Sequence, residues 1–243
     1  MKGLLILGLC LPLTLSGCVQ VNDGTVTILA ASSLADVMPQ IVELAEQDRP
    51  DETFEVSYAG SSQIVQQLNS GVDADVVILA GEGPLESLDA DLARSEPSVV
   101  ATNILTIALA PGNPAGITSV DDLARDDVTL VLCADQVPCG DAAAQMLALA
   151  KVIPNVASYE PDVRATLAKV ASGEADAGVV YVTDAASVLG SDIETVAVPT
   201  GAQVENRYPA FSVDGSEGGA EFVALLTSDD AQEVLAKAGF GAP

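Results

Sequence analysis

Two serine residues, Ser33 and Ser61, each stand between an apolar segment and a stretch with the apolar spacing of a helix. The apolar segments 26–30 and 54–59 are predicted strands, and Gly60 allows a tight turn before the second helix. A helix that begins directly after a strand leaves backbone N–H groups unpaired at the positive end of its dipole. Serine hydroxyls beside such groups predict an anion-binding site, although helix capping is the commoner role of a serine at this position.

The elements that must position these serines alternate along the chain. Ser33 and Asp36 have the spacing of a capping box, which predicts a helix over about 34–47, with Pro39 bending its first turns. Alternating strands and helices predict an α/β fold with mainly parallel sheets. The other predicted strands are 75–80, 104–110, 128–132, 177–182, 194–198 and 208–213. The other predicted helices are around 64–68, 85–92, 119–123, 141–151, 163–170 and 220–238.

Further strand–helix junctions follow later in the chain. They lie at 137–141 and 161–163, and Tyr181 stands at the end of a predicted strand. In open α/β sheets, ligands bind where the carboxyl ends of strands meet the N-termini of helices. Two lobes with a cleft between them would bring all these junctions together.

The composition excludes several classes of function. The formal net charge of −26 argues against binding of nucleic acid. The chain has no histidine, so histidine triads and histidine metal sites are excluded, and no Gly-x-Ser-x-Gly turn is present. We therefore do not expect an enzyme or a cofactor. An exported hydrolase that uses Ser33, and a surface interaction protein without a small ligand, are the weaker alternatives.

The first residues have the pattern of an export signal. Lys2 precedes an apolar run, and residues 15–18, LSGC, resemble the lipobox of bacterial lipoproteins. The resemblance implies that 1–17 is a cleaved signal peptide, that Cys18 is lipidated, and that 18–25 is a tether. The protein would then be exported and anchored to the outer face of the cell membrane. An ordinary signal peptide that happens to contain a cysteine is the alternative.

Apart from Cys18, two cysteines follow the signal, Cys133 and Cys139. In an oxidising compartment they predict a structural disulfide that closes a small loop at the third junction. A redox or metal role is the lesser interpretation, because the spacing is not Cys-x-x-Cys and two thiols without histidine make an incomplete zinc site.

Short segments spread over the mature chain together resemble a known family, the extracytoplasmic molybdate-binding proteins of ABC transporters. The segments are AASSL at 30–34, YAGSS at 58–62, DADVVI at 73–78, VPCG at 137–140, DVR at 162–164, GVVYVTDA at 178–185 and YPA at 208–210. The resemblance implies a two-lobed periplasmic-binding-protein fold with a two-stranded hinge. Each lobe would be a mainly parallel sheet flanked by helices, with 26–102 plus 201–243 in lobe I and 103–200 in lobe II.

The resemblance also implies a ligand and the residues that hold it. The hydroxyls of Ser33, Ser61 and Tyr181 would bind a molybdate or tungstate ion, with backbone amides of Ser33, Ser61, Cys139 and Val163. If molybdate is counted as a metal, these same residues are its metal site. The expected partners are the small oxyanion and an ABC permease in the membrane, and the protein would act as a monomer. The family more often has alanine at Cys139, and Asp141 places a carboxylate near the anion.

A site of neutral donors suits a fully deprotonated dianion. Each hydrogen bond to a charged acceptor contributes roughly 1.5–3 kcal/mol, so several can offset the loss of hydration. Monohydrogen phosphate carries a proton that needs an acceptor, and a donor-only site penalises it. Molybdate, tungstate and sulfate carry no such proton, so a receptor for sulfate or another tetrahedral oxyanion is the closest alternative.

Overall fold

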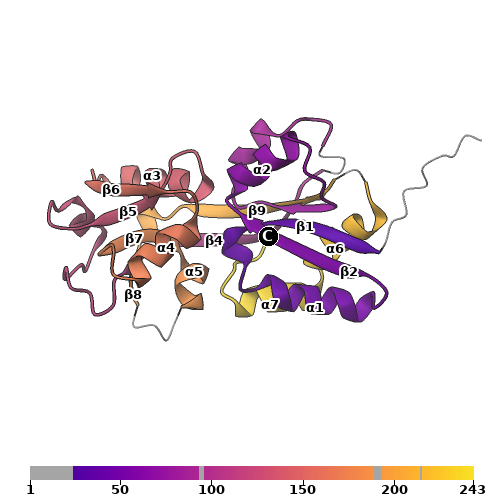
Figure 1. Cartoon of the computed structure of the whole chain (residues 1–243). Helices are drawn as coiled ribbons and strands as arrows, with labels where there is room; N and C mark the ends of the chain where they lie inside the picture. Colours follow the sequence, from indigo (N-terminus) through magenta and orange to yellow (C-terminus); the bar gives the residue numbers. More distant parts are fainter. Residues whose placement is uncertain (1–23, 93–95, 189–192, 214) are drawn as a thin grey trace, which may run out of the picture.

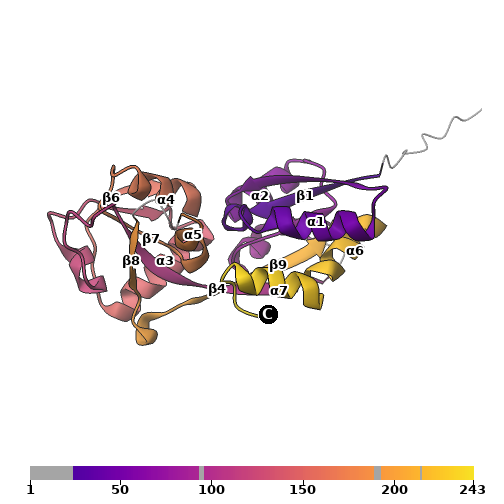
Figure 2. The same cartoon turned by 90° about the horizontal axis from the view of Figure 1, so that it is seen from below.

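The computed structural model describes residues 24–92, 96–188, 193–213 and 215–243. The predicted signal peptide and Cys18 lie outside the described residues. Two lobes lie side by side and are joined by the long strands β4 (Ser98–Leu109) and β9 (Glu205–Ser212), as Figures 1 and 2 show. No helix among the described residues combines the length and the apolar character needed to cross a membrane.

The first lobe contains the N-terminal strands. β1 (Thr25–Ala31) pairs in parallel with β2 (Thr53–Ala59) and with β3 (Val76–Ile78). β9 then pairs antiparallel with β3 and with the first half of β4. The carboxyl ends of β1, β2 and β3 therefore meet at one edge of this sheet.

The second lobe is built around the second half of β4. That half pairs antiparallel with β7 (Ala177–Tyr181) and with β8 (Glu194–Ala197). β5 (Leu130–Cys133) pairs in parallel with β7 and with β6 (Val156–Glu160). The sheets are thus less parallel than the sequence predicts, because β4 and β9 pass between the lobes and pair antiparallel with all their neighbours.

Helices cover both faces of the sheets. The longer ones are α1 (Met38–Asp48), α2 (Ser61–Asn69), α3 (Pro138–Ala150), α4 (Val163–Ala171), α6 (Glu217–Leu226) and α7 (Asp229–Lys237). The shorter ones are α5 (Val182–Ser187) and the 3₁₀ turns η1 (Ser32–Leu34), η2 (Gly83–Ser87), η3 (Val120–Ala124) and η4 (Thr200–Ala202).

The apolar residues form separate cores in the two lobes. In the first lobe, alternate residues of β1 point to opposite faces: Ile28 packs under α1, α6 and α7, while Leu29 packs under α2. A single larger cluster fills the second lobe and extends to Ala202. Each lobe therefore has its own core. The exact limits of the lobes stay a proposal.

Three local expectations are corrected by the structure. Ser33 lies inside η1 and does not cap α1, which begins at Met38. Pro39 is therefore in the first turn of α1, where a proline is well tolerated and no bend is needed. The predicted helix 220–238 is two helices, because the Ser228 hydroxyl accepts a bond from the Ala231 N–H and starts α7.

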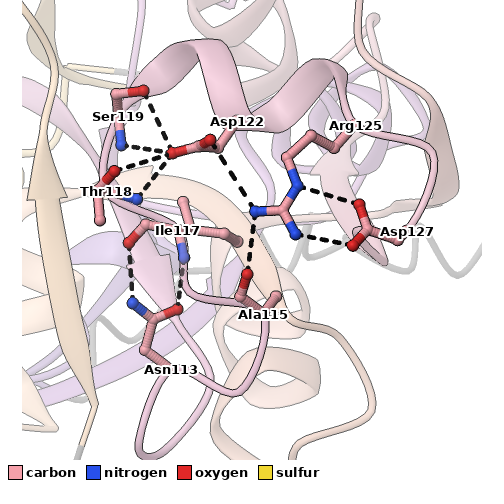
Figure 3. A network of polar contacts seen from close by, with 8 residues as sticks. All are labelled: Asn113, Ala115, Ile117, Thr118, Ser119, Asp122, Arg125 and Asp127. Carbon is pink, nitrogen blue, oxygen red and sulfur yellow. Dashed lines mark hydrogen bonds and ion pairs between the residues drawn. The ribbon is translucent and has the colours of Figure 1, made fainter.

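The predicted capped turn after residue 119 is present as η3. The Asp122 carboxylate accepts bonds from the backbone N–H groups of Thr118 and Ser119, at 2.9 and 3.0 Å (Figure 3). Arg125 donates to Asp127 at 3.0 and 2.8 Å in the same network. This cluster lies within the second lobe and fixes the loop that leads from β4 to β5.

Candidate functional site

The predicted junctions meet at a small cavity between the two lobes. Its volume is about 20 Å³, slightly more than the roughly 10–15 Å³ that one water molecule needs. It is lined by Ala31, Ser32, Ser33, Gly60, Ser61 and Ala80 from the first lobe, and by Val137, Pro138, Cys139, Asp162, Val163 and Tyr181 from the second. A cavity of this size is too small for an organic ligand.

Three helices begin at this cavity. Ser61 is the first residue of α2 and Val163 is the first residue of α4, so their N–H groups have no partner within the helix. α3 begins with Pro138, which has no N–H, so Cys139 supplies its first backbone donor. The positive ends of the three helix dipoles thus come together from both lobes, an arrangement that favours an anion.

Tyr181 places a hydroxyl at the cavity from the end of β7. The side chain is buried, and its hydroxyl has no hydrogen-bond partner among the described residues. Burial raises its pKa well above the usual value, with Tyr208 and Asp184 adding to the effect, so the phenol keeps its proton at neutral pH. A buried, unpaired donor costs roughly 1–3 kcal/mol, which an acceptor in the cavity would recover.

The two serine hydroxyls are oriented by neighbouring groups. Ser61 Oγ accepts a bond from the Ala80 N–H at 2.8 Å, which leaves its own proton to donate. Ser33 Oγ lies 2.9 Å from the Tyr208 hydroxyl, and Asn103 Nδ2 donates to that same hydroxyl at 3.3 Å. Either hydroxyl can be the donor in the Ser33–Tyr208 bond, so Tyr208 and Asn103 fix the position of the Ser33 hydroxyl beside the cavity.

The hydrogen-bond donors that line the cavity are neutral groups rather than basic side chains. Among the described residues, no lysine or arginine lines the cavity. Asp162 does line it, but its carboxylate accepts a bond from the Ala165 N–H at 2.9 Å and caps α4. Asp141 does not line it and instead accepts a bond from Gln145 on an exposed face.

A larger cavity of about 510 Å³ adjoins the small one and shares Val137 and Pro138 with it. Its lining contains four carboxylates and one arginine: Glu82, Asp135, Asp141, Glu205 and Arg207. These carboxylates would repel a dianion, so the smaller cavity is the better candidate for an anion site.

Cys133 and Cys139 form a disulfide with a Cα–Cα distance of 5.7 Å. It joins the end of β5 to the first turn of α3. The Cys139 sulfur is therefore bonded to Cys133 and is not free to bind a ligand. Cys139 can contribute its backbone N–H to the cavity.

The structure brings the five predicted site residues together: Ser33, Ser61, Cys139, Val163 and Tyr181 all line the same cavity. Sequence reasoning missed Asn103 and Tyr208, which orient the Ser33 hydroxyl. Tyr208 belongs to one of the segments that carry the family resemblance, but Asn103 has no local sequence signal, since its contact depends on the pairing of β4 with β9.

These features define a two-lobed binding protein with a cavity at the junction of its lobes. The chain belongs to the family of bacterial extracellular solute-binding proteins, whose family model matches residues 26–241. This is a family of binding proteins rather than enzymes, as the composition predicts.

Individual relatives agree with this assignment. The chain is 34% identical over 223 residues to the molybdate-binding protein ModA of Mycobacterium tuberculosis (strain ATCC 25618 / H37Rv), covering 90% of this chain and 85% of the relative. It is 29% identical over 227 residues to YvgL of Bacillus subtilis (strain 168), provisionally named an ABC transporter substrate-binding lipoprotein, covering 90% and 86%.

Solved structures show the same fold. The periplasmic molybdate-binding protein of Azotobacter vinelandii matches with a TM-score of 0.77 at 17% identity, covering 90% of this chain and 99% of that one. The sulfate-binding protein SubI of Mycobacterium tuberculosis H37Rv matches with a TM-score of 0.76 at 17% identity, covering 89% and 86%. The predicted α/β periplasmic-binding-protein fold is therefore confirmed.

Proposed function

We propose that this chain captures molybdate, and tungstate with it, in the small cavity between its lobes and delivers the ion to an ABC permease. The observation that carries the proposal is the Tyr181 hydroxyl, a buried donor at a cavity lined by other donors, with no hydrogen-bond partner in the part of the chain that the structure describes. The molybdate-binding relatives support the choice of ion.

The bound ion would be held by hydroxyl and amide donors from both lobes. Ser33, Ser61 and Tyr181 would donate their hydroxyl protons, and the helix N-termini at Ser61, Cys139 and Val163 would donate backbone N–H groups. Such donors replace the hydration shell of a dianion without a full countercharge. Because the donors come from both lobes, binding would hold the lobes closed, and the permease would recognise the closed form.

Anchoring is part of the same proposal. The lipobox at 15–18 would place a lipid on Cys18, and the provisional naming of YvgL as a lipoprotein supports this. The protein would then work as a monomer on the outer face of the cell membrane. Mass spectrometry of the membrane fraction should find a diacylglycerol on Cys18, and an unmodified, secreted chain would contradict it.

A sulfate receptor is the second candidate, since sulfate is also tetrahedral and fully deprotonated at neutral pH. Isothermal titration calorimetry of the mature domain with sodium molybdate, tungstate, sulfate and phosphate separates the two. We expect tight, one-to-one binding of molybdate and tungstate and weaker binding of sulfate. Phosphate should bind poorly, because the Asp162 carboxylate, which lines the cavity, is already engaged as a helix cap. Tight sulfate binding without molybdate binding would overturn the proposal.

A further inference from the structure

Arg164, the second residue of α4, crosses from the second lobe to the first. Its Nη2 pairs with the Asp36 carboxylate, and its Nε donates to the Ser32 carbonyl oxygen at 3.3 Å. Both partners belong to the segment between β1 and α1 in the first lobe. These contacts can exist only while the two lobes are in contact.

The same guanidinium is held in place by its own lobe. Its Nε lies 3.1 Å from Oδ1 of the buried Asp184, and its Nη1 donates to Ser187 Oγ at 3.0 Å. Asp184 and Ser187 belong to α5, so these contacts do not depend on lobe closure. The side chain is therefore pre-organised, and less rotamer entropy is lost when it meets Asp36.

Arg164 also acts on a donor of the cavity. A trans peptide points its C=O and N–H in opposite directions. The bond from Arg164 to the Ser32 carbonyl therefore fixes the direction of the Ser33 N–H, which belongs to the same peptide unit and lies at the cavity. The positive charge polarises this peptide without itself lining the cavity.

We propose that Arg164 is a latch that keeps the lobes closed over the bound oxyanion, so that it controls the rate of release. This inference rests on the proposed function. The latch contacts form after the ion has entered, so they should lower koff and leave kon nearly unchanged.

Asp36 gives the cleaner test, because it is exposed and its removal leaves the Arg164–Asp184 pair intact. We expect Asp36→Ala to speed the release of radioactive molybdate into excess unlabelled molybdate by roughly threefold to fivefold, the effect of losing one exposed ion pair. Charge alone predicts the opposite sign, since removing a negative residue near a dianion should tighten binding. Kd from calorimetry then gives kon as the ratio of koff to Kd.

Asp127→Ala is the matched control, because Asp127 is an exposed carboxylate paired with Arg125 inside one lobe (Figure 3). Its koff should equal that of the wild type. Arg164→Gln should raise koff more than Asp36→Ala, with folding checked by urea unfolding. Equal release rates for Asp36→Ala, Asp127→Ala and the wild type would overturn the latch while leaving the proposed function standing. A wild-type chain that binds no molybdate would overturn both.

Discussion

Neighbouring groups hold the two serine hydroxyls in position at the cavity. Ser33 is held by Tyr208, Ser61 is oriented by the Ala80 N–H, and the Tyr181 hydroxyl has no partner within the described ranges. None of these donors carries a charge, so the anion would be held by directed dipoles in a buried place, where each bond is stronger than in water.

Tyr181→Phe tests the third hydroxyl. The change removes one donor to a charged acceptor, so we expect the affinity for molybdate to fall roughly ten- to a hundredfold. The free protein should be as stable as the wild type or more so, because the lost hydroxyl bonds to none of the residues that the structure describes. Calorimetry and urea unfolding measure the two effects. Tyr58→Phe, at an exposed tyrosine, is the control, and an unchanged affinity for Tyr181→Phe would contradict this role.

Asp184 predicts an unusual dependence of stability on pH. Burial raises the pKa of this carboxyl from 3.8 to about 7, although Arg164 opposes the shift. The folded chain therefore binds a proton between pH 4 and 7 that the unfolded chain releases, and its stability falls as pH rises through this range. No histidine titrates alongside it. We expect the free energy of unfolding in urea to decrease from pH 5.5 to 8, and Asp184→Asn to remove this slope. A wild-type stability that is flat or rising would contradict the assignment.

At the scale of the elements, the strand–helix junctions could be predicted from the sequence. The first half of β4 and the start of α1 could not. Apolar runs located β1, β2 and β7, because buried strands leave a continuous local pattern. The first half of β4, with Thr102 and Asn103, has no such pattern and was missed. The Ser33 capping box was wrong because Ser33 lies inside the 3₁₀ turn η1 and α1 begins only at Met38.

The same contrast holds for the candidate site. Residues at junctions were found because a helix N-terminus can be located in the sequence. The contacts of Ser33 with Tyr208 and of Asp36 with Arg164 join residues 175 and 128 positions apart. Such contacts depend on how β9 and α4 are placed, and no local pattern indicates that placement.

The Cys133–Cys139 disulfide should stabilise the start of α3 without taking part in binding. We expect Cys133→Ala/Cys139→Ala to lower the free energy of unfolding by about 2 kcal/mol, since the bond closes a short loop. Molybdate affinity should change by less than threefold, roughly the effect of small shifts in one donor, because Cys139 contributes only its N–H. Thermal unfolding and calorimetry check this, and a folded variant that no longer binds would contradict it.

At the scale of the whole molecule, closure brings the backbones of the two lobes very near each other. A Cβ atom added at Gly60 would lie 2.9 Å from the Pro161 carbonyl oxygen, with Gly60 in the first lobe and Pro161 in the second. The bond from the Ser62 hydroxyl to the Gln136 carbonyl, at 2.6 Å, also joins the lobes. Only glycine fits at position 60 while the lobes are closed.

Gly60→Val should therefore impair closure rather than folding. We expect molybdate-loaded Gly60→Val to keep a larger radius of gyration than the loaded wild type in small-angle scattering, with weaker binding. Gly83→Val is the control, because an added Cβ meets nothing within 4 Å there. Equal radii and affinities for Gly60→Val and the wild type would show that the close approach is not needed.

The most direct measurement is anomalous diffraction at the molybdenum absorption edge from crystals grown with sodium molybdate. We predict one strong peak in the cavity between the lobes, with oxygen atoms within hydrogen-bond distance of the hydroxyls of Ser33, Ser61 and Tyr181. A peak elsewhere, or no peak from a protein saturated with molybdate, would contradict the account.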